Sequence, residues 1–235
     1  MPGIDLAILG FPKCGTSALF RELALLPQVS SVRAASGSME VSLSELDRVF
    51  DCQHREFLVY KYAAGIYSQK YIEIIYQARP STKFVLCHRN PIKSLVSWHN
   101  MHRNIARKQE PLSHFAARES DFYSNCSVLE YYEKFAKPML RYDKHFERLA
   151  RLVPGESIIC ISQHALAART VEVASTVLSA VVGESVKEVQ EGSPHTAYAD
   201  SVMEDISEGI TDELDASYSR LLRSIEDGGY LSIML

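Results

Sequence analysis

The segment that most constrains the fold of this chain lies at its beginning, where a strand, a glycine-bearing loop and a helix follow one another. Residues 4–9 form an apolar run typical of a short buried strand. Residues 10–17 read Gly-Phe-Pro-Lys-Cys-Gly-Thr-Ser, and residues 18–26 have the composition of a helix. This order turns backbone N–H groups and a helix N-terminus toward an anion. The segment therefore predicts an α/β fold with a phosphate-binding loop after its first strand.

Strand and helix patterns alternate along the rest of the chain. Small residues at 30–38 and polar residues at 108–125 indicate loops. Such alternation predicts a mainly parallel central sheet with helices on both faces, and ligands that bind beyond the carboxyl ends of the strands. We expect one domain over residues 1–235, with further strands at 57–61, 83–88 and 157–162, and helices at 41–50, 69–78, 91–107, 128–152 (broken near Pro138), 170–182 and 211–227.

Composition limits the classes of partner. With 46% hydrophobic and 23% charged residues the chain is globular, and its net charge of -4 gives no general attraction to nucleic acid or to anionic membranes. No apolar run approaches the roughly 20 residues that span a bilayer. The first strand begins too early to leave room for a signal peptide, so we expect a cytoplasmic protein. The five cysteines are scattered and form no metal or redox motif.

The position of the lysine in the loop separates it from the nucleotide-triphosphatase loop. That loop ends in Gly-Lys-Ser/Thr, whereas Lys13 stands two residues before Gly15. Lys13 offers a mobile positive charge, and Thr16 and Ser17 add hydroxyl donors at the helix start. The alternative is an ordinary strand-to-helix turn with a solvated lysine.

A second basic element follows the predicted strand 83–88. Arg89 stands at the carboxyl end of that strand, and its planar guanidinium suits a phosphate. Asn90 is a good N-cap and Pro91 a good first helical residue. Ser97 lies about two turns into the helix and can add a hydroxyl donor. Helix capping beside a surface arginine is the alternative interpretation.

Together the two elements resemble the phosphate-binding segments of sulfotransferases. The resemblance implies a P-loop NTPase-like fold, 3′-phosphoadenosine 5′-phosphosulfate (PAPS) as donor, 3′,5′-bisphosphoadenosine (PAP) as product, and no requirement for a metal. Ala18 and Ala63 replace residues typical of the small-phenol branch, so the chain is closer to the glycan-modifying and bacterial branch. The implied donor-binding residues are Pro12, Lys13, Cys14, Gly15, Thr16, Ser17 and Ala18 for the phosphosulfate, and Arg89 and Ser97 for the 3′-phosphate.

The resemblance also implies catalytic roles. Lys13 would neutralise the leaving phosphate, and Lys61 resembles a second active-site lysine near the sulfate. Glu40 has the spacing of the base in the bacterial branch, and His99 is the second candidate. Each has a structural alternative: Glu40 as a first-turn helix glutamate, Lys61 as a surface lysine, and His99 and His102 as surface or packed residues.

The acceptor stays open. A hydroxyl or amine of a glycan, a lipid or a natural product fits, with no nucleic acid and no membrane span involved, and the oligomeric state is not indicated.

Residues 188–204 contain His195 but no Arg or Lys, whereas the family has a late basic segment that closes over the 3′-phosphate. Two alternatives are a P-loop kinase, which would need a different loop, and a non-catalytic nucleotide-binding relative.

Overall fold

The strands of the protein form one parallel sheet. The structure, a computed structural model, describes residues 3–33, 56–108, 120–183 and 207–233. Within these residues the sheet is six-stranded, with the order β2-β3-β1-β4-β5-β6 and parallel pairing throughout. This confirms the predicted α/β fold class. The strands are β1 (Leu6–Gly10), β2 (Val29–Arg33), β3 (Phe57–Lys61), β4 (Lys83–His88), β5 (Ile158–Ser162) and β6 (Leu231–Ile233).

The central strands are buried along almost their whole length and consist mainly of apolar residues. Every residue of β1 and of β5 is buried, and so are all but the first residues of β3 and β4. Continuous apolar runs of this kind form where both faces of a parallel sheet are covered. The core therefore lies in two layers, one on each side of the sheet.

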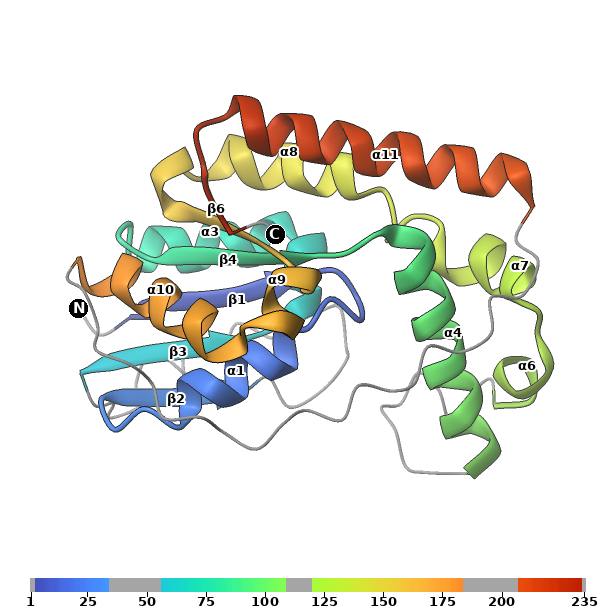
Figure 1. The fold of residues 1–235 in the computed structure, drawn as a ribbon, viewed down its shortest axis with the longest axis horizontal. Coiled ribbons are helices and arrows are strands. Elements are labelled where there is room, and N and C mark those ends of the chain that lie inside the picture. Colours follow the sequence, from blue (N-terminus) through green and yellow to red (C-terminus); the bar gives the residue numbers. More distant parts are fainter. Residues whose placement is uncertain (1–2, 34–55, 109–119, 184–206, 234–235) are drawn as a thin grey trace.

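Helices cover both faces of the sheet (Figure 1). One face carries α1 (Thr16–Ala24), α9 (Gln163–Ala168) and α10 (Thr170–Val182). The opposite face carries α3 (Gln69–Ala78), α8 (Tyr142–Leu152) and α11 (Glu208–Asp227). A 3-10 turn, η1 (Ala63–Tyr67), follows β3.

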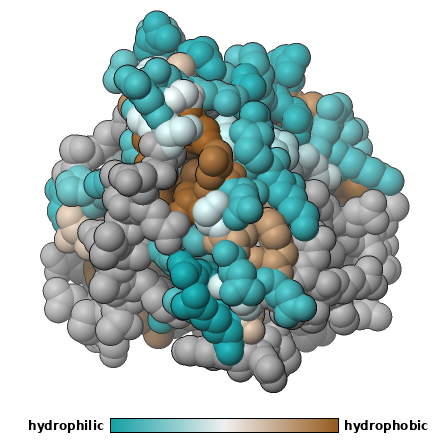
Figure 2. Space-filling view, turned by 90° about the vertical axis from the view of Figure 1, so that its right-hand side faces the viewer, coloured by the Kyte–Doolittle hydropathy of each residue, from teal (hydrophilic) through white to brown (hydrophobic). Residues whose placement is uncertain are grey.

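A further group of helices stands beyond the carboxyl ends of the strands. It consists of α4 (Pro91–Lys108), α6 (Ser120–Asn125) and α7 (Val128–Tyr131), and α4 contacts both of the others. Figure 2 looks onto this end of the molecule, where hydrophobic residues gather near the centre and hydrophilic residues lie above, below and to the right of them. No described helix is both long enough and apolar enough to cross a membrane.

The structure corrects three sequence-based assignments. Part of the stretch 30–38, predicted as a loop, belongs to the edge strand β2, which pairs with β3. Part of the stretch 108–125, predicted as irregular, forms α6. The predicted helix 128–152 is divided into α7, a π-helical turn (η2, Tyr132–Ala136) and α8, and the predicted break near Pro138 is confirmed. The predicted helix 41–50 lies outside the described residues.

Candidate active site

The parallel register brings the ends of several strands to one edge of the sheet. Ile8 of β1 pairs with Lys61 of β3, and Gly10 pairs with Cys87 of β4. The loop after β1, the last residue of β3 and the segment after β4 therefore meet at the same place. Ligands of this sheet class bind at such an edge.

The loop between β1 and α1 has the backbone of an anion site. Lys13 and Gly15 both have positive φ angles, 61° and 88°. Residues in this left-handed conformation curl the chain and turn N–H groups inward. Gly15 caps α1 without a side-chain hydrogen bond, and the first turn of α1 carries no acidic residue. The start of α1, with Thr16 and Ser17, can therefore receive a phosphate group.

Contacts with β4, α4 and α8 fix the conformation of the loop. A Cβ at Gly10 would lie 2.9 Å from the carbonyl oxygen of Cys87, so the first position of the loop requires glycine. The rings of Phe11 and Tyr142 are stacked with centroids 3.5 Å apart, and the hydroxyl of Ser94 donates to the carbonyl oxygen of Pro12. A loop fixed in this way keeps its donors in position without a ligand.

Cys14 is a packed residue of the loop. Its side chain is buried, with Sγ 3.9 Å from the hydroxyl oxygen of Tyr142. Burial raises the pKa of its thiol to about 12, although Tyr142, Arg89 and Ser94 act in the opposite direction. Cys14 is therefore a thiol at neutral pH and lacks the thiolate character of a reactive cysteine.

Three cationic side chains surround the loop. Nζ of Lys61 donates to Oγ of Ser17 over 3.0 Å, although only 7% of Lys61 is exposed. Burial lowers the pKa of Lys13, and the positive charge of Arg89 lowers it further. The same sheet edge thus gathers Lys13, Lys61 and Arg89, which the sequence had suggested separately. An anionic ligand would relieve the repulsion between these charges.

The segment after β4 begins α4 as expected. Oδ1 of Asn90 accepts hydrogen bonds from the backbone N–H groups of Ile92 and Lys93 over 3.0 and 3.2 Å. Pro91 is the first residue of the helix. The side chains of Arg89 and Ser97 are half-buried, as is Ala18 at the start of α1. Arg89 and Ser97 are thus accessible to a second phosphate.

The structure describes only one of the two residues predicted as the base. Glu40 lies outside the described residues. His99 is completely buried, and its Nε2 donates to the carbonyl oxygen of Cys126 over 2.9 Å. Trp98 is also buried, against the rings of Tyr131 and Phe135. These contacts favour packing roles for His99 and Trp98.

Sequence reasoning did not identify Ser94 or Met101 as neighbours of the loop. Ser94 stands one turn into α4, where its contact with Pro12 depends on how α4 is placed against the loop. Sδ of Met101 lies 3.8 Å from Nζ of Lys13. Only the three-dimensional position of α4 reveals these two contacts, because the sequence fixes the helix but not the face that it turns to the loop.

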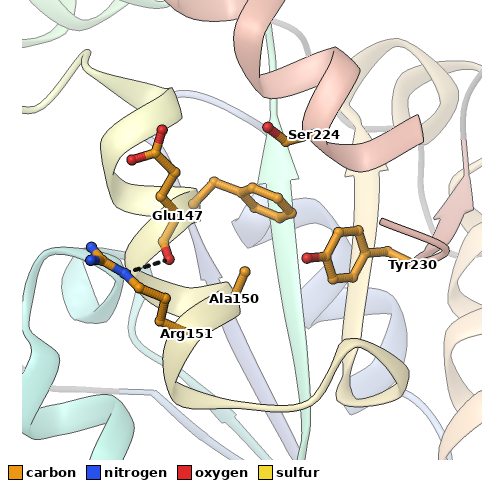
Figure 3. Close-up of a pocket in the computed structure, with 6 residues that line it drawn as sticks. Glu147, Ala150, Arg151, Ser224 and Tyr230 are labelled. Atoms are coloured by element: carbon orange, nitrogen blue, oxygen red, sulfur yellow. Dashed lines mark hydrogen bonds between the residues drawn. The ribbon is translucent and has the colours of Figure 1, made fainter. Parts of the chain in front are cut away.

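A shallow pocket lies at the other end of the sheet. Phe146, Ala150 and Arg151 of α8 line it together with Ser224 and Tyr230 (Figure 3). Nε of Arg151 donates to the carbonyl oxygen of Glu147 over 3.2 Å, which engages the guanidinium within its own helix. Tyr230 immediately precedes β6, so this pocket lies near the amino ends of the strands, away from the loop.

Among the described residues, no group of three or more His, Cys, Asp or Glu side chains could hold a metal ion. The positive charge at the loop comes from side chains, and the chain can hold a phosphate through these and through backbone donors.

Solved structures with a similar fold are sulfotransferases. One from Alicyclobacillus acidocaldarius has a TM-score of 0.64 and 21% identity, over 96% of this chain and 97% of that one. One from Mycobacterium avium has a TM-score of 0.59 and 12% identity, over 93% and 76%. A mouse sulfotransferase in complex with PAP has a TM-score of 0.53 and 13% identity, over 94% and 63%. These similarities establish the fold.

Family membership rests on the sequence. A search of curated proteins finds no significant match. The model of the sulfotransferase domain matches residues 4–151, a range that contains the loop at 10–17 and the segment from Arg89 to Ser97. Because this match covers more than half of the chain and includes both of the predicted phosphate-binding elements, the protein belongs to the sulfotransferase family.

Proposed function

We propose that this protein transfers a sulfuryl group from PAPS to a hydroxyl or amine of a glycan, lipid or natural-product acceptor. The observation that carries the proposal is the convergence of Lys13, Lys61 and Arg89 on one curled loop at the carboxyl edge of the sheet. Such a site suits a ligand with several negative charges. PAPS has this character and supplies an activated sulfuryl group when it is bound.

The loop would bind the phosphosulfate end of the donor. Backbone N–H groups of residues 12–18 and the hydroxyls of Thr16 and Ser17 would donate to the 5′-phosphate oxygens. Lys13 would neutralise the negative charge that develops on the leaving phosphate, where a positioned cation is most effective. Lys61, held by Ser17, would stabilise the transferring group from the β3 side.

The segment after β4 would bind the other end of the donor. Arg89 offers a bidentate fork to the 3′-phosphate, and Ser97 lies on α4 about two turns further on. A nucleotide that bridges the two elements explains why the chain needs a basic site at each. Residues 188–204, which contain no Arg or Lys, lie outside the described residues.

The acceptor must lose a proton as the new bond forms. Glu40 and His99 are the candidates that the family resemblance suggests. The buried Nε2–H of His99 is engaged by Cys126, which favours Glu40 of these two. In this proposal residues 1–235 act as one cytoplasmic domain, and charge neutralisation by side chains makes a metal unnecessary.

Calorimetry separates this proposal from a P-loop kinase. We expect PAP to bind without magnesium, and ATP with magnesium to bind at least tenfold more weakly, because Arg89 selects a 3′-phosphate. Arg89→Ala should weaken PAP binding by about tenfold or more, equivalent to about 1.4 kcal/mol. Tight binding of ATP together with no binding of PAP would exclude the proposal.

An assay of sulfate transfer separates an enzyme from a nucleotide-binding relative. Radiolabelled PAPS would be offered with a panel of glycans, lipid alcohols, amines and phenols. Transfer that requires Lys13 supports the proposal. Tight PAP binding with no transfer to any class in the panel, under conditions where a known sulfotransferase is active, would favour the non-catalytic alternative.

A further inference from the structure

We infer that His102, held by Tyr131, accepts the proton of the sulfate acceptor. This inference rests on the proposed function. It assigns the role of proton acceptor to a residue that the structure describes, whereas Glu40 lies outside the described residues and Nε2 of His99 is engaged by Cys126. It follows from the place of His102 next to Met101 on α4 and from its contact with Tyr131.

His102 directly follows on α4 the methionine that contacts the lysine of the loop. Met101, its neighbour in the chain, has its sulfur 3.8 Å from Nζ of Lys13. The charge of Lys13 also contributes to lowering the pKa of His102, so Lys13 acts on this imidazole electrostatically. In this inference the acceptor lies between the loop and this imidazole.

His102 differs from His99 in what its nitrogens contact. His99, almost one turn earlier, is completely buried and donates to Cys126. His102 is half-buried, and its Nδ1 lies 3.0 Å from the hydroxyl oxygen of Tyr131. Nε2 of His102 makes no hydrogen bond to any residue that the structure describes. One nitrogen is thus held and the other is available.

The surroundings of His102 fix its ring. The rings of Trp98, Tyr123, Tyr131 and Phe135 have centroids between 5.2 and 5.8 Å from its own. A ring enclosed in this way keeps one orientation, as a positioned proton acceptor requires.

The charge state of His102 also suits this role. Burial lowers its pKa to about 4, and the electrostatic influence of His99 and of Lys13 acts in the same direction. The titratable groups that contact the ring are Tyr123 from α6 and Tyr131 from α7, and those that act on its charge from other positions are Lys13 in the loop and His99 in α4. Burial raises the pKa of Tyr131 far above its usual value, so its phenol stays protonated. His102 is therefore neutral at pH 7, and the negative charges of the donor would raise its pKa toward the working range.

The proton transfer balances as follows. The acceptor oxygen forms a bond to sulfur while the bond from sulfur to the phosphate oxygen breaks. The acceptor proton passes to Nε2 of His102, and the leaving phosphate keeps the electron pair beside Lys13. Nδ1–H of the resulting imidazolium donates to Tyr131, and the imidazolium later returns its extra proton to water. This requires the tautomer with hydrogen on Nδ1.

The tautomer can be tested without knowing the acceptor. In protein with ¹⁵N-labelled histidine, the signal that disappears in His102→Asn belongs to His102. We expect its nitrogens to show hydrogen on Nδ1 and a lone pair on Nε2, and its pKa to rise by about one unit when PAP is added. If PAP binds and the hydrogen is on Nε2, the inference is overturned and the proposed function stands. If PAP does not bind at all, the proposed function itself fails.

Turnover with an acceptor from the panel provides the second test. His102→Asn keeps an amide near the position of Nδ1, so the contact with Tyr131 can persist while the proton acceptor is lost. We expect kcat to fall by roughly 100-fold or more with little change in PAP affinity, and Tyr131→Phe to have a smaller effect together with a shifted pH profile. Asn104→Ala, exposed on the same helix, is the matched control. Turnover of His102→Asn within twofold of the natural protein, or loss of turnover in Glu40→Gln alone, would overturn the inference.

Discussion

Lys13, the cation that we propose for the leaving phosphate, has a strained backbone. Its φ of 61° is rare for a residue with a side chain and costs about 1 kcal/mol relative to glycine. A residue kept in such a conformation is typical of functional loops. The strain sets the direction of the amide groups on either side and the direction of the ammonium group at the same time.

Replacement of Lys13 should therefore separate activity from stability. Lys13→Ala should abolish sulfate transfer and leave the fold intact, since alanine has the same backbone strain as lysine. Lys13→Gly should be equally inactive but about 1 kcal/mol more stable than Lys13→Ala. Transfer assays and urea unfolding measure the two effects. Lys93→Ala, exposed on α4, is the control, and retained turnover in Lys13→Ala would remove the lysine from the mechanism.

His88 should make the folded protein sensitive to acid. Burial lowers its pKa from 6.5 to about 4, and its Nδ1 lies 3.2 Å from the hydroxyl of Tyr218. Below pH 6.5 the unfolded chain binds a proton that the folded protein does not. The free energy of unfolding should thus fall as the pH falls from 6.5 to 4, by at most about 1.4 kcal/mol per unit from this residue.

Urea unfolding at pH 7, 6 and 5 checks the contribution of His88. His88→Gln should reduce the pH dependence over this range, whatever its effect on stability at pH 7. Tyr218→Phe keeps the imidazole buried and should retain the dependence. An identical slope in His88→Gln and in the natural protein would show that the loss of stability in acid comes from other groups.

At the scale of elements, two glycines with similar backbone angles have different surroundings. Gly15 begins α1 with a φ of 88°, and a Cβ there would lie 2.6 Å from Cδ2 of Leu166 in α9. Gly183 ends α10 with a φ of 78°, and nothing described lies within 4 Å of such a Cβ. The first is constrained by backbone and by packing, the second by backbone alone.

Alanine at these two positions should therefore have unequal effects. Gly183→Ala should lower the free energy of unfolding by about 1 kcal/mol and leave PAP binding unchanged. Gly15→Ala should lower it further, by about 2–3 kcal/mol, because Leu166 must move. It should also weaken PAP binding, since the start of α1 shifts. Calorimetry and urea unfolding compare the pair, and equal PAP affinities would contradict this view of the loop.

The elements also show what the sequence could and could not predict. The starts of α1 and α4 were predictable because glycine, asparagine and proline have strong local preferences there. The edge strands β2 and β6 were missed because Val29–Arg33 is polar in its centre and Leu231–Ile233 is only three residues long. The contact of Lys61 with Ser17 joins distant parts of the chain. The difference between His99 and His102 depends on the direction of α4, which local patterns do not encode.

At the scale of the whole molecule, the helix α11 is linked to the loop between β1 and α1 through α8. The buried carboxylate of Asp143 accepts hydrogen bonds from Ser217 and Arg220 of α11, each over 2.7 Å. The next residue toward the N-terminus, Tyr142, stacks on Phe11 in the loop. The family match ends at residue 151, so α11 lies beyond it and yet contributes to the support of the site.

Loss of this support should affect both stability and binding. Arg220→Ala leaves the buried Asp143 with less compensation and should lower the free energy of unfolding by about 2 kcal/mol. PAP binding should weaken as well, because α8 holds Phe11. Arg223→Ala, exposed on the same helix with its Nε donating to Ser219, is the matched control. Full PAP affinity in a destabilised Arg220→Ala would show that α11 stabilises the fold without acting on the loop.

The packing of Trp98 has a practical consequence. It is the only tryptophan of the chain, and its ring centroid lies 5.8 Å from that of His102. A protonated imidazole quenches indole fluorescence, whereas a neutral one does so weakly. The natural protein therefore has an intrinsic optical reporter next to His102, and if donor binding raises the pKa of this imidazole as we infer, the emission of one chromophore should follow proton uptake in real time, without a label or a known acceptor.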